Sequence, residues 1–430
     1  MIKRFARLFI TSLLATLSRG IIRKYKPKII MITGSVGKTA TKDAIAAALS
    51  NTYFLRKSEK SFNSEFGVPL TIIGAKNPWT NIFSWLRVFR QAAALLLLPS
   101  HYPKLLVLEV GADRPGDLAH ILHIATPDVV VVTRLPEVPV HVEAYATPQA
   151  LRDEEFTPAY ALAPAAPLII SADDPHALAM AARLPVRVTT YGFREEAQVH
   201  LADVRPLLEN GRVIGMQASV RVENFAGNIK VRGSVGRQQL APCAAALAAA
   251  RVLGISFADA LAGMDSYVPP QGRARIFSGQ NGSVLIDDSY NASPASTEEA
   301  LDTLRTLPNT TRRIAVLGDM LELGRYSVEE HERIGRLSAE SADIVIAVGI
   351  RTRGLAVAAQ DAGLVGESVQ IFDTATEAIP ALVALVRDGD AVLVKGSQSM
   401  RMERIVEALL ENPDDKKQLV RQGHEWKQRP

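Results

Sequence analysis

A short glycine-containing segment near the amino end of the chain has the residue types that bind nucleotide phosphates. Gly34, Ser35 and Gly37 precede Lys38 and Thr39, between an apolar run typical of a β-strand and a stretch with helical periodicity. Glycines let backbone N–H groups approach phosphate oxygens, and the start of a helix adds positive potential. We expect Lys38 to reach the outer phosphates and Thr39 to bind Mg²⁺. The segment is a shortened phosphate loop, because an isoleucine stands where the first glycine of the full pattern belongs.

Two further side chains have chemistry that suits a magnesium site. Glu109 ends an apolar run that predicts a parallel strand, and ligands bind beyond the carboxyl ends of such strands. Beside a phosphate loop, its carboxylate is expected to hold Mg²⁺ or one of its waters. His141 follows later in the chain, and its spacing alone leaves open whether it binds a ligand or makes a structural hydrogen bond.

Strand and helix patterns alternate from residue 28 onward, which would place these groups at the edge of a sheet. Continuous apolar runs occupy 29–32, 105–108, 129–132 and 168–170. Such runs between helical segments predict a parallel sheet covered on both faces. Apolar and polar residues then alternate over 214–223, which predicts a small antiparallel sheet with one solvated face.

A second α/β series follows the Pro269–Gly272 linker, with apolar runs that predict a Rossmann-like sheet. The predicted fold class is therefore α/β, with a P-loop central domain followed by a Rossmann-like C-terminal domain. The expected divisions are a basic amphipathic helix at 1–27, a central domain at 28–264, a C-terminal domain at 265–412 and a frayed, charged tail at 413–430.

Composition excludes several classes of protein. With 47% hydrophobic residues and a net charge of +4, the chain is not disordered as a whole. Cys243 is the only cysteine, so an intrachain disulfide is excluded. No apolar run reaches the roughly 20 residues that a membrane-spanning helix needs.

The positive charge is concentrated in the first 28 residues, where eight basic residues occur and no acid appears before Asp43. Apolar residues recur there at helical spacing, with polar and basic residues on the other side. The apolar set is Ile2, Phe5, Phe9, Leu13 and Leu17, and the opposite set is Arg4, Arg7, Thr11 and Ser18. Two interpretations remain open: a helix lying on an anionic membrane surface, or a helix packed on the protein's own core. A signal peptide is disfavoured because export would separate the phosphate loop from ATP. Nucleic-acid binding is disfavoured because stacking aromatics are not interleaved with the basic residues.

Seven ordered motifs together resemble the Mur ligases, and within them the branch that adds D-alanyl-D-alanine. The motifs are residues 32–39, 63–70, 109–112, 141–143, 287–292, 316–324 and 395–397. The resemblance covers roughly residues 28–410 and implies an ATP-binding central domain and a C-terminal domain that close on each other. It also implies ATP and Mg²⁺ as cofactors, a peptide carboxylate activated as an acyl phosphate, and attack by an amine such as D-Ala-D-Ala.

The resemblance further implies roles for individual residues. His141 would hold a second Mg²⁺ near the acyl group, and Arg273 would reach the phosphates from the second domain. Asp288 would accept hydrogen bonds from the ribose, with Tyr290 and Asn291 nearby. The residues expected to face substrate are Asn63, Lys395 and Ser397.

Three departures from the family pattern stand out. Only the basic helix precedes the phosphate loop, so the family's N-terminal uridine-binding domain is expected to be absent. No lysine occurs between Lys104 and Lys230, where the family commonly uses a carbamylated lysine for the second Mg²⁺. We expect Asp153, Glu154 or Glu155 to replace it, since Mg²⁺ accepts carboxylate oxygens. The sequence at 236–240 also differs from the family's adenine-binding motif.

The leading hypothesis is a cytoplasmic ATP-dependent ligase of peptidoglycan synthesis, peripheral at the inner membrane face. A different amide ligation on the same scaffold is the alternative among enzymes. A catalytically silent, ATP-binding scaffold is the alternative outside them.

Overall fold

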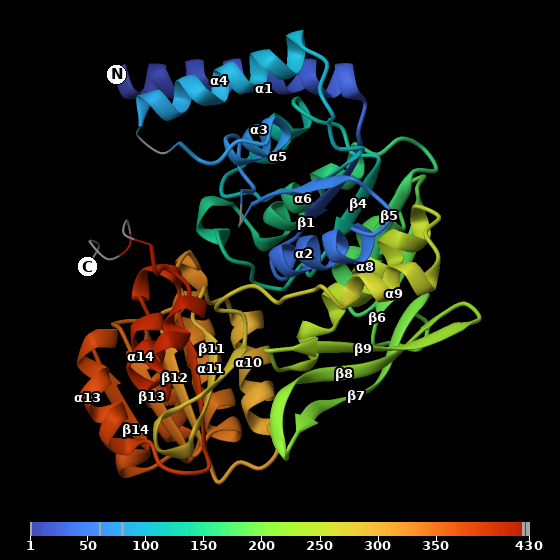
Figure 1. The fold of residues 1–430 in the computed structure, drawn as a ribbon. Helices are drawn as coiled ribbons and strands as arrows, with labels where there is room; N and C mark the ends of the chain where they lie inside the picture. The colour runs from blue at the N-terminus through green and yellow to red at the C-terminus, as the bar shows by residue number, and fades with distance from the viewer. Residues whose placement is uncertain (1, 60–61, 79–80, 424–425, 427–430) are drawn as a thin grey trace.

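The computed structural model describes residues 2–59, 62–78, 81–423 and 426 (Figure 1). Two α/β domains follow one another along the chain, and each is built on its own sheet. A pair of helices, α1 (Ile2–Tyr25) and α4 (Ile82–Leu97), covers the first domain on the side away from the second domain. The predicted α/β class is confirmed.

The first sheet begins as the predicted parallel sheet. Its parallel strands are β1 (Lys28–Thr33), β2 (Leu55–Lys57), β3 (Leu105–Glu109), β4 (Val129–Val132), β5 (Pro167–Ser171) and β6 (Arg187–Gly192). They are arranged in the order β2-β3-β1-β4-β5-β6. β1 therefore lies in the middle, with Glu109 and the phosphate loop at the same edge of the sheet.

The antiparallel region is not a separate sheet, in contrast to the prediction. It consists of β7 (Val199–Glu209), β8 (Arg212–Val222) and β9 (Phe225–Arg232). β7 continues the parallel sheet because Tyr191 and Gly192 of β6 pair with its first residues. All nine strands thus form one sheet, and the antiparallel part extends toward the second domain.

Helices cover both faces of the parallel part, as its continuous apolar strands require. Ile30 and Ile32 of β1 face a core shared with α2 (Lys38–Leu49), α8 (Ala241–Val252) and α9 (Phe257–Met264). Ile29 and Met31 face the opposite core. That core lies against α1 and α4 and against α3 (Gly67–Ile73), α5 (Asp117–Leu122), α6 (Pro148–Tyr160) and α7 (Pro175–Ala181).

The second domain has the predicted Rossmann-like form. Its sheet has the order β10-β11-β15-β12-β13-β14 and is parallel apart from β10. The strands are β10 (Arg275–Ser278), β11 (Val284–Asp288), β12 (Arg312–Gly318), β13 (Ile344–Val348), β14 (Val369–Phe372) and β15 (Asp390–Lys395). The covering helices are α10 (Pro294–Thr306), α11 (Ser327–Ser341), α12 (Thr352–Asp361), α13 (Ala375–Leu385) and α14 (Glu403–Leu409).

Helix α1 packs on the protein's own core, but its inward face coincides only in part with the predicted stripe. Leu17 of that stripe packs against the core, and the side chains of Ile2 and Phe5 lie outside the described part of the structure. Leu14, Ser18 and Ile21 are fully buried, whereas Phe9 is 62% exposed. The helix is thus turned so that its inward face is centred on Leu14 and Ile21, because α3 and α4 supply the apolar surface there. Within the described residues, no helix is both long enough and apolar enough to cross a membrane.

The first part of the predicted frayed tail is ordered. After a short 3₁₀ helix, η7 (Pro413–Gln418), Leu419 and Val420 are buried against the second domain. Arg421 donates to Glu403 and to the carbonyl of Tyr290. This segment differs from the prediction, because Leu419 and Val420 pack against the domain and Arg421 forms a buried ion pair with Glu403. The many charged residues around them had indicated a solvated tail.

Candidate active site

The phosphate loop has the backbone conformation that its glycines allow. β1 ends at Thr33 and α2 begins at Lys38, while Gly34 and Gly37 have φ angles of +113° and +91°. A Cβ on Gly34 would lie only 2.4 Å from Oγ1 of Thr133. Glycine is therefore required at this position both for its conformation and for the close approach of β4.

Lys38 folds back over the loop. Its ammonium group donates to the carbonyl of Gly34 and lies 3.4 Å from the carbonyl of Ser35. The Lys38 Nζ is thus held above the loop whose N–H groups would bind a phosphate. An incoming phosphate would offer this ammonium a charged partner in place of a neutral carbonyl.

Glu109 lies beside the first turn of α2, at the end of β3. It is 1% exposed, and its Oε1 accepts a hydrogen bond of 3.1 Å from Oγ1 of Thr39. Its Oε2 is buried and accepts no hydrogen bond from the described residues, although Nζ of Lys42 lies 3.4 Å away. Ser58 accepts a hydrogen bond from the Glu109 backbone N–H and so helps to fix the strand end.

The chemistry of these groups fits Mg²⁺. Thr39 and Glu109 present hard oxygen donors, and one carboxylate oxygen has no hydrogen bond from the described residues. Among these residues, no group of three or more His, Cys, Asp or Glu side chains is close enough to hold a metal ion. A site with few protein ligands is typical of Mg²⁺ that is completed by waters and substrate phosphates.

His141 contacts the second domain. It has a left-handed conformation, with a φ of +69°, and its Nδ1 lies 2.9 Å from Oε2 of Glu322. Its Nε2 lies 3.6 Å from Oδ1 of Asp113. Burial lowers the pKa of His141, but the hydrogen bond and charge of Glu322 and the charge of Asp113 outweigh it, so that the net shift of the pKa is upward.

Of the three acidic residues proposed to replace the missing lysine, Glu155 faces the phosphate loop. It is 4% exposed, and its Oε2 accepts a hydrogen bond of 2.6 Å from Oγ of Ser35. Burial raises the pKa of Glu155, while the charges of Lys38 and His141 oppose that shift. Glu154 instead accepts a hydrogen bond from the backbone of Leu118. Asp153 accepts one from Gln149, on the exposed side of α6.

A second polar cluster lies at the carboxyl ends of β11 and β15. Nζ of Lys395 is buried and lies 2.6 Å from Oδ2 of Asp288. The other oxygen of Asp288 accepts a hydrogen bond from the backbone of Ala274, and Lys395 also donates to the carbonyl of Asn291. The group predicted to bind ribose and the group predicted to face the amine are therefore paired with each other here.

The remaining predicted residues lie near these clusters. The guanidinium of Arg273 stacks over the ring of Tyr290 at 4.1 Å from its centroid. Ser397 is 3% exposed and accepts a hydrogen bond from the backbone of Leu321, in the loop that carries Glu322. The backbone carbonyl of Asn63 accepts a hydrogen bond from the backbone N–H of Gly111, just beyond Glu109.

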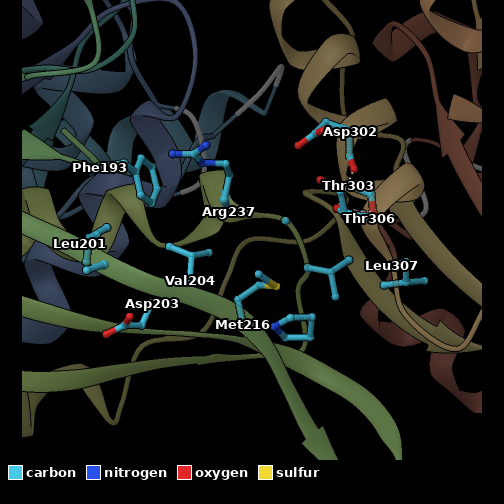
Figure 2. A pocket seen from close by; sticks show the side chains of 14 residues that line it. Phe193, Leu201, Asp203, Val204, Met216, Arg237, Asp302, Thr303, Thr306 and Leu307 are labelled. Carbon is cyan, nitrogen blue, oxygen red and sulfur yellow. Dashed lines mark hydrogen bonds between the residues drawn. The ribbon is translucent and has the colours of Figure 1, made fainter. Parts of the chain in front are cut away.

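A cleft of about 420 Å³ separates the antiparallel part of the first sheet from α10 of the second domain (Figure 2). On one wall, the guanidinium of Arg237 lies 4.2 Å above the ring of Phe193. Thr303 and Asp302 lie on the opposite wall, and Val204 forms part of the floor. Gly236 and Arg237, at the start of the segment that differs from the family's adenine motif, border this cleft, and the side-chain amide of Gln238 donates a hydrogen bond to Thr303 on the opposite wall.

Comparison with known proteins assigns this architecture. A model of the Mur ligase middle domain matches residues 32–250, and a model of the Mur ligase glutamate ligase domain matches residues 272–398. The chain belongs to the Mur ligase family. It is accordingly an ATP-dependent ligase that forms carbon–nitrogen bonds and uses Mg²⁺.

Individual proteins are similar to this one in sequence or structure over most of the chain. It is 26% identical over 401 residues to the UDP-N-acetylmuramoyl-tripeptide–D-alanyl-D-alanine ligase of Bacillus subtilis, covering 93% of this chain and 79% of that protein. The ligase of the same name from Mycobacterium tuberculosis is 29% identical over 403 residues, covering 89% and 72%. The crystal structure of MurF ligase from Thermotoga maritima with ADP is 25% identical, with a TM-score of 0.74, and the match covers 94% of this chain and 84% of that one.

Sequence reasoning missed Lys42 and the partner of His141. Lys42 is one helical turn beyond Lys38, so its four-residue spacing placed it on the same face of α2. Glu322 was part of a recognised Mur ligase motif, but nothing in its spacing shows that it meets His141 from the other domain. Glu155 could have been singled out, because Leu151 and Ala159 place it on the buried face of α6.

Proposed function

We propose that this Mur ligase joins D-Ala-D-Ala, or a similar amine, to the carboxylate of a peptidoglycan-precursor peptide. The observation that carries the proposal is the phosphate-loop site of Lys38, Thr39 and Glu109, in a chain matched along most of its length by UDP-N-acetylmuramoyl-tripeptide–D-alanyl-D-alanine ligases. The peptide carboxylate attacks the γ-phosphorus of ATP, the bond from that phosphorus to the β-phosphate oxygen breaks, and ADP leaves as the acyl phosphate forms. The amine then attacks the acyl carbon, and phosphate leaves.

The main obstacle is the approach of two anions in the first step, so positive charge is the central requirement. In the proposal, Lys38 neutralises the phosphates from the first domain and Arg273 from the second. Thr39 and Glu109 would hold the Mg²⁺, which would supply positive charge beside the phosphate oxygens. These groups are brought to the first domain's sheet edge and to the interdomain linker by the fold.

Glu155 is proposed to take the place of the carbamylated lysine, in a second Mg²⁺ site with His141. The support is its burial against Ser35 and the influence of Lys38 and His141 on its carboxyl group. Its backbone is also fixed, because Thr33 donates to its carbonyl.

The other site roles follow the resemblance. Asp288 is proposed to bind the ribose, with Tyr290 and Asn291 nearby. Its oxygens can accept further hydrogen bonds beside those from Ala274 and Lys395. The cleft beside Phe193 is the proposed position of the base. The residues proposed to contact substrate remain Asn63, Lys395 and Ser397.

The domain limits 28–264 and 265–412 also remain proposals, as does a cytoplasmic location. For the basic segment at residues 1–22, the proposal is a peripheral contact with an anionic membrane.

The test is ADP release by the purified protein with UDP-linked muramoyl tripeptide, with D-Ala-D-Ala, and with both, followed by mass spectrometry of the product. The expected result is release that depends on both compounds and a product with the pentapeptide mass. Release with a different amine would support another amide ligation. ATP binding without turnover on lipid-linked or UDP-linked donors would favour the silent scaffold.

A further inference from the structure

Helices α1 and α4 lie side by side and run in the same direction. Nζ of Lys24, near the end of α1, donates to the carbonyls of Leu95 and Leu98 at 2.7 Å each. The hydroxyl of Tyr25 donates to Leu95 as well, at 2.8 Å. A Cβ on Gly20 would lie 3.0 Å from Leu96. These contacts join the last turns of both helices, so the two form a single outer layer of the first domain (Figure 1).

Large apolar side chains lie on the solvent-facing side of α4. Phe83, Leu86 and Leu97 are 77%, 61% and 81% exposed. They share one helical stripe with two exposed arginines, Arg87 and Arg90, because each of the five lies three, four or seven residues from at least one other member. The other face of α4 packs inward through Val88 and Ala92, so the apolar stripe is not needed for the core.

The outer stripe of α1 has a similar character. Phe9 is 62% exposed, and Arg19 and Arg23 are exposed farther along the same face. Because the helices are parallel, Phe9 lies toward the Phe83 end of α4, and the two arginines lie toward its other end. Within the described side chains, apolar and basic residues therefore occur toward both ends of the layer.

The layer and its connections carry no negative charge. No Asp or Glu occurs in residues 1–42 or 66–108, although both segments contain several Lys and Arg residues. The chain as a whole has 49 basic and 45 acidic residues, so this separation is specific to the layer. An ordinary solvated face mixes both signs of charge.

We propose that the outer faces of α1 and α4 together form a docking surface for an anionic lipid bilayer. This inference rests on the proposed membrane contact of residues 1–22 and extends it to a second helix from elsewhere in the chain. Phe83, Leu86 and Leu97 enter the boundary between headgroups and acyl chains, while the arginines bind lipid phosphates. The surface lies on the side of the first domain away from the second, so docking leaves the approach between the domains open.

A bilayer fits this surface better than a nucleic acid does. Single-stranded nucleic acid requires aromatics that can stack along a basic groove. Here the exposed apolar residues include aliphatic leucines on the outer side of a helix pair. An interfacial helix has this combination of bulky apolar side chains with basic residues and no acids.

The experiment is co-sedimentation of the full chain with vesicles of phosphatidylglycerol and phosphatidylcholine in equal amounts, and with phosphatidylcholine alone. Binding is expected to the anionic vesicles, to weaken as salt is added, and to be weak on the neutral ones. Arg87→Glu/Arg90→Glu should weaken it by about tenfold or more, since each basic residue contributes at an anionic surface. Phe83→Ser/Leu86→Ser should weaken it as well, with less dependence on salt.

Matched controls make the same kind of change, charge reversal or apolar to serine, on other surfaces. Arg212→Glu/Arg336→Glu alters two exposed arginines, on β8 and α11, by the same charge. Val357→Ser/Val365→Ser alters two exposed apolar residues of the second domain. Both controls should sediment as the parent does, and thermal melts should show that every variant is folded.

Three results would overturn the inference: no binding to anionic vesicles, equal binding by the α4 variants and the parent, or a dimer in solution that the α4 variants abolish. The last would assign the surface to a second copy of the chain. ADP release measured without vesicles separates this inference from the proposed ligation. Absence of vesicle binding with normal ADP release would contradict only the docking surface. Normal vesicle binding without ADP release would contradict only the proposed ligation.

Discussion

The two domains differ in how their charged groups are bonded at the edges of their sheets. In the first domain, Glu109 keeps one buried oxygen without a hydrogen bond from the described residues, with Nζ of Lys42 3.4 Å from it, and Lys38 donates to neutral carbonyls. In the second domain, Lys395 and Asp288 are paired directly, and both oxygens of Asp288 are bonded.

This difference indicates that the domains contribute to the site in different ways. The first domain offers bonding capacity that a phosphate or a metal ion can use at once. In the second domain, Lys395 and Asp288 already stabilise the fold through their ion pair. A substrate must therefore bind in addition to that pair or replace one of its members. Removing a charge should therefore affect mainly turnover in the first domain and mainly stability in the second.

Removing the Lys38 ammonium is expected to have the largest effect. Lys38→Ala should lower the rate of ADP release by about a thousandfold, because an electrostatic group that meets developing charge is lost. The melting temperature should change little, since the hydrogen bonds that Lys38 makes within the described part of the chain go to carbonyls of its own loop. Lys104→Ala, at an exposed lysine of the same domain, is the control. A variant that retained half of the parent's rate would contradict the role of the loop.

Lys395→Met should reverse this pattern. It leaves the buried carboxylate of Asp288 without its charged partner, which is expected to lower the free energy of unfolding by about 3 kcal/mol. Denaturant unfolding measures the loss. Lys395→Met/Asp288→Asn should recover much of it, because no uncompensated charge then remains. If the single variant were as stable as the parent, the contrast between the domains would not hold.

Glu155→Gln tests the carboxylate that faces the phosphate loop. Ligation should become about 10- to 100-fold slower, as is typical when a group that supports a metal site is altered. The Mg²⁺ concentration that gives the half-maximal rate should rise at the same time. Glu154→Gln and Asp153→Asn are close controls on the same helix and should retain the parent's rate. Equal rates for all three variants would remove Glu155 from the site.

Asp287→Asn tests a buried acid of the second domain that has no charged partner at hydrogen-bonding distance among the described residues. Burial raises the pKa of Asp287 to about 6, against an ordinary value of 3.8. The folded state then binds more protons than the unfolded state between about pH 4 and pH 6, so this group makes the protein less stable as the pH rises. The substitution should flatten that dependence and raise stability at pH 7 by about 2 kcal/mol. Unfolding curves across pH 4–8 measure it, and an unchanged slope would contradict the shift.

Much of the architecture could be predicted because its causes are local. The continuous apolar runs around Ile30, Val107 and Val131 predict buried parallel strands whatever their neighbours are. The glycines before Lys38 indicate a phosphate loop because their conformations are needed there and their order is fixed along the chain. The antiparallel alternation was also visible, but its junction to β6 was not, since it depends on a pairing of only two residues at each strand.

The site was predicted less completely, because the partner of each charged side chain is a residue that is distant in the sequence and comes close only in the folded protein. Lys395 and Asp288 are 107 residues apart in the sequence, and their spacing does not show that they neutralise each other. The contact between His141 and Glu322 likewise depends on how the domains meet. The direction that α1 faces depended on apolar surface that α3 and α4 provide.

The sequence by itself determined the two α/β domains, the phosphate loop, the strand-end glutamate and the separation of basic from acidic residues. Each of these follows from residue type and period over a short segment. The tertiary structure alone decided that Glu155, rather than its acidic neighbours, faces the loop, that Lys395 is held by Asp288, and that α4 joins α1 in one acid-free layer. These depend on which distant surfaces come together, because burial and charge pairing act through space and not along the chain.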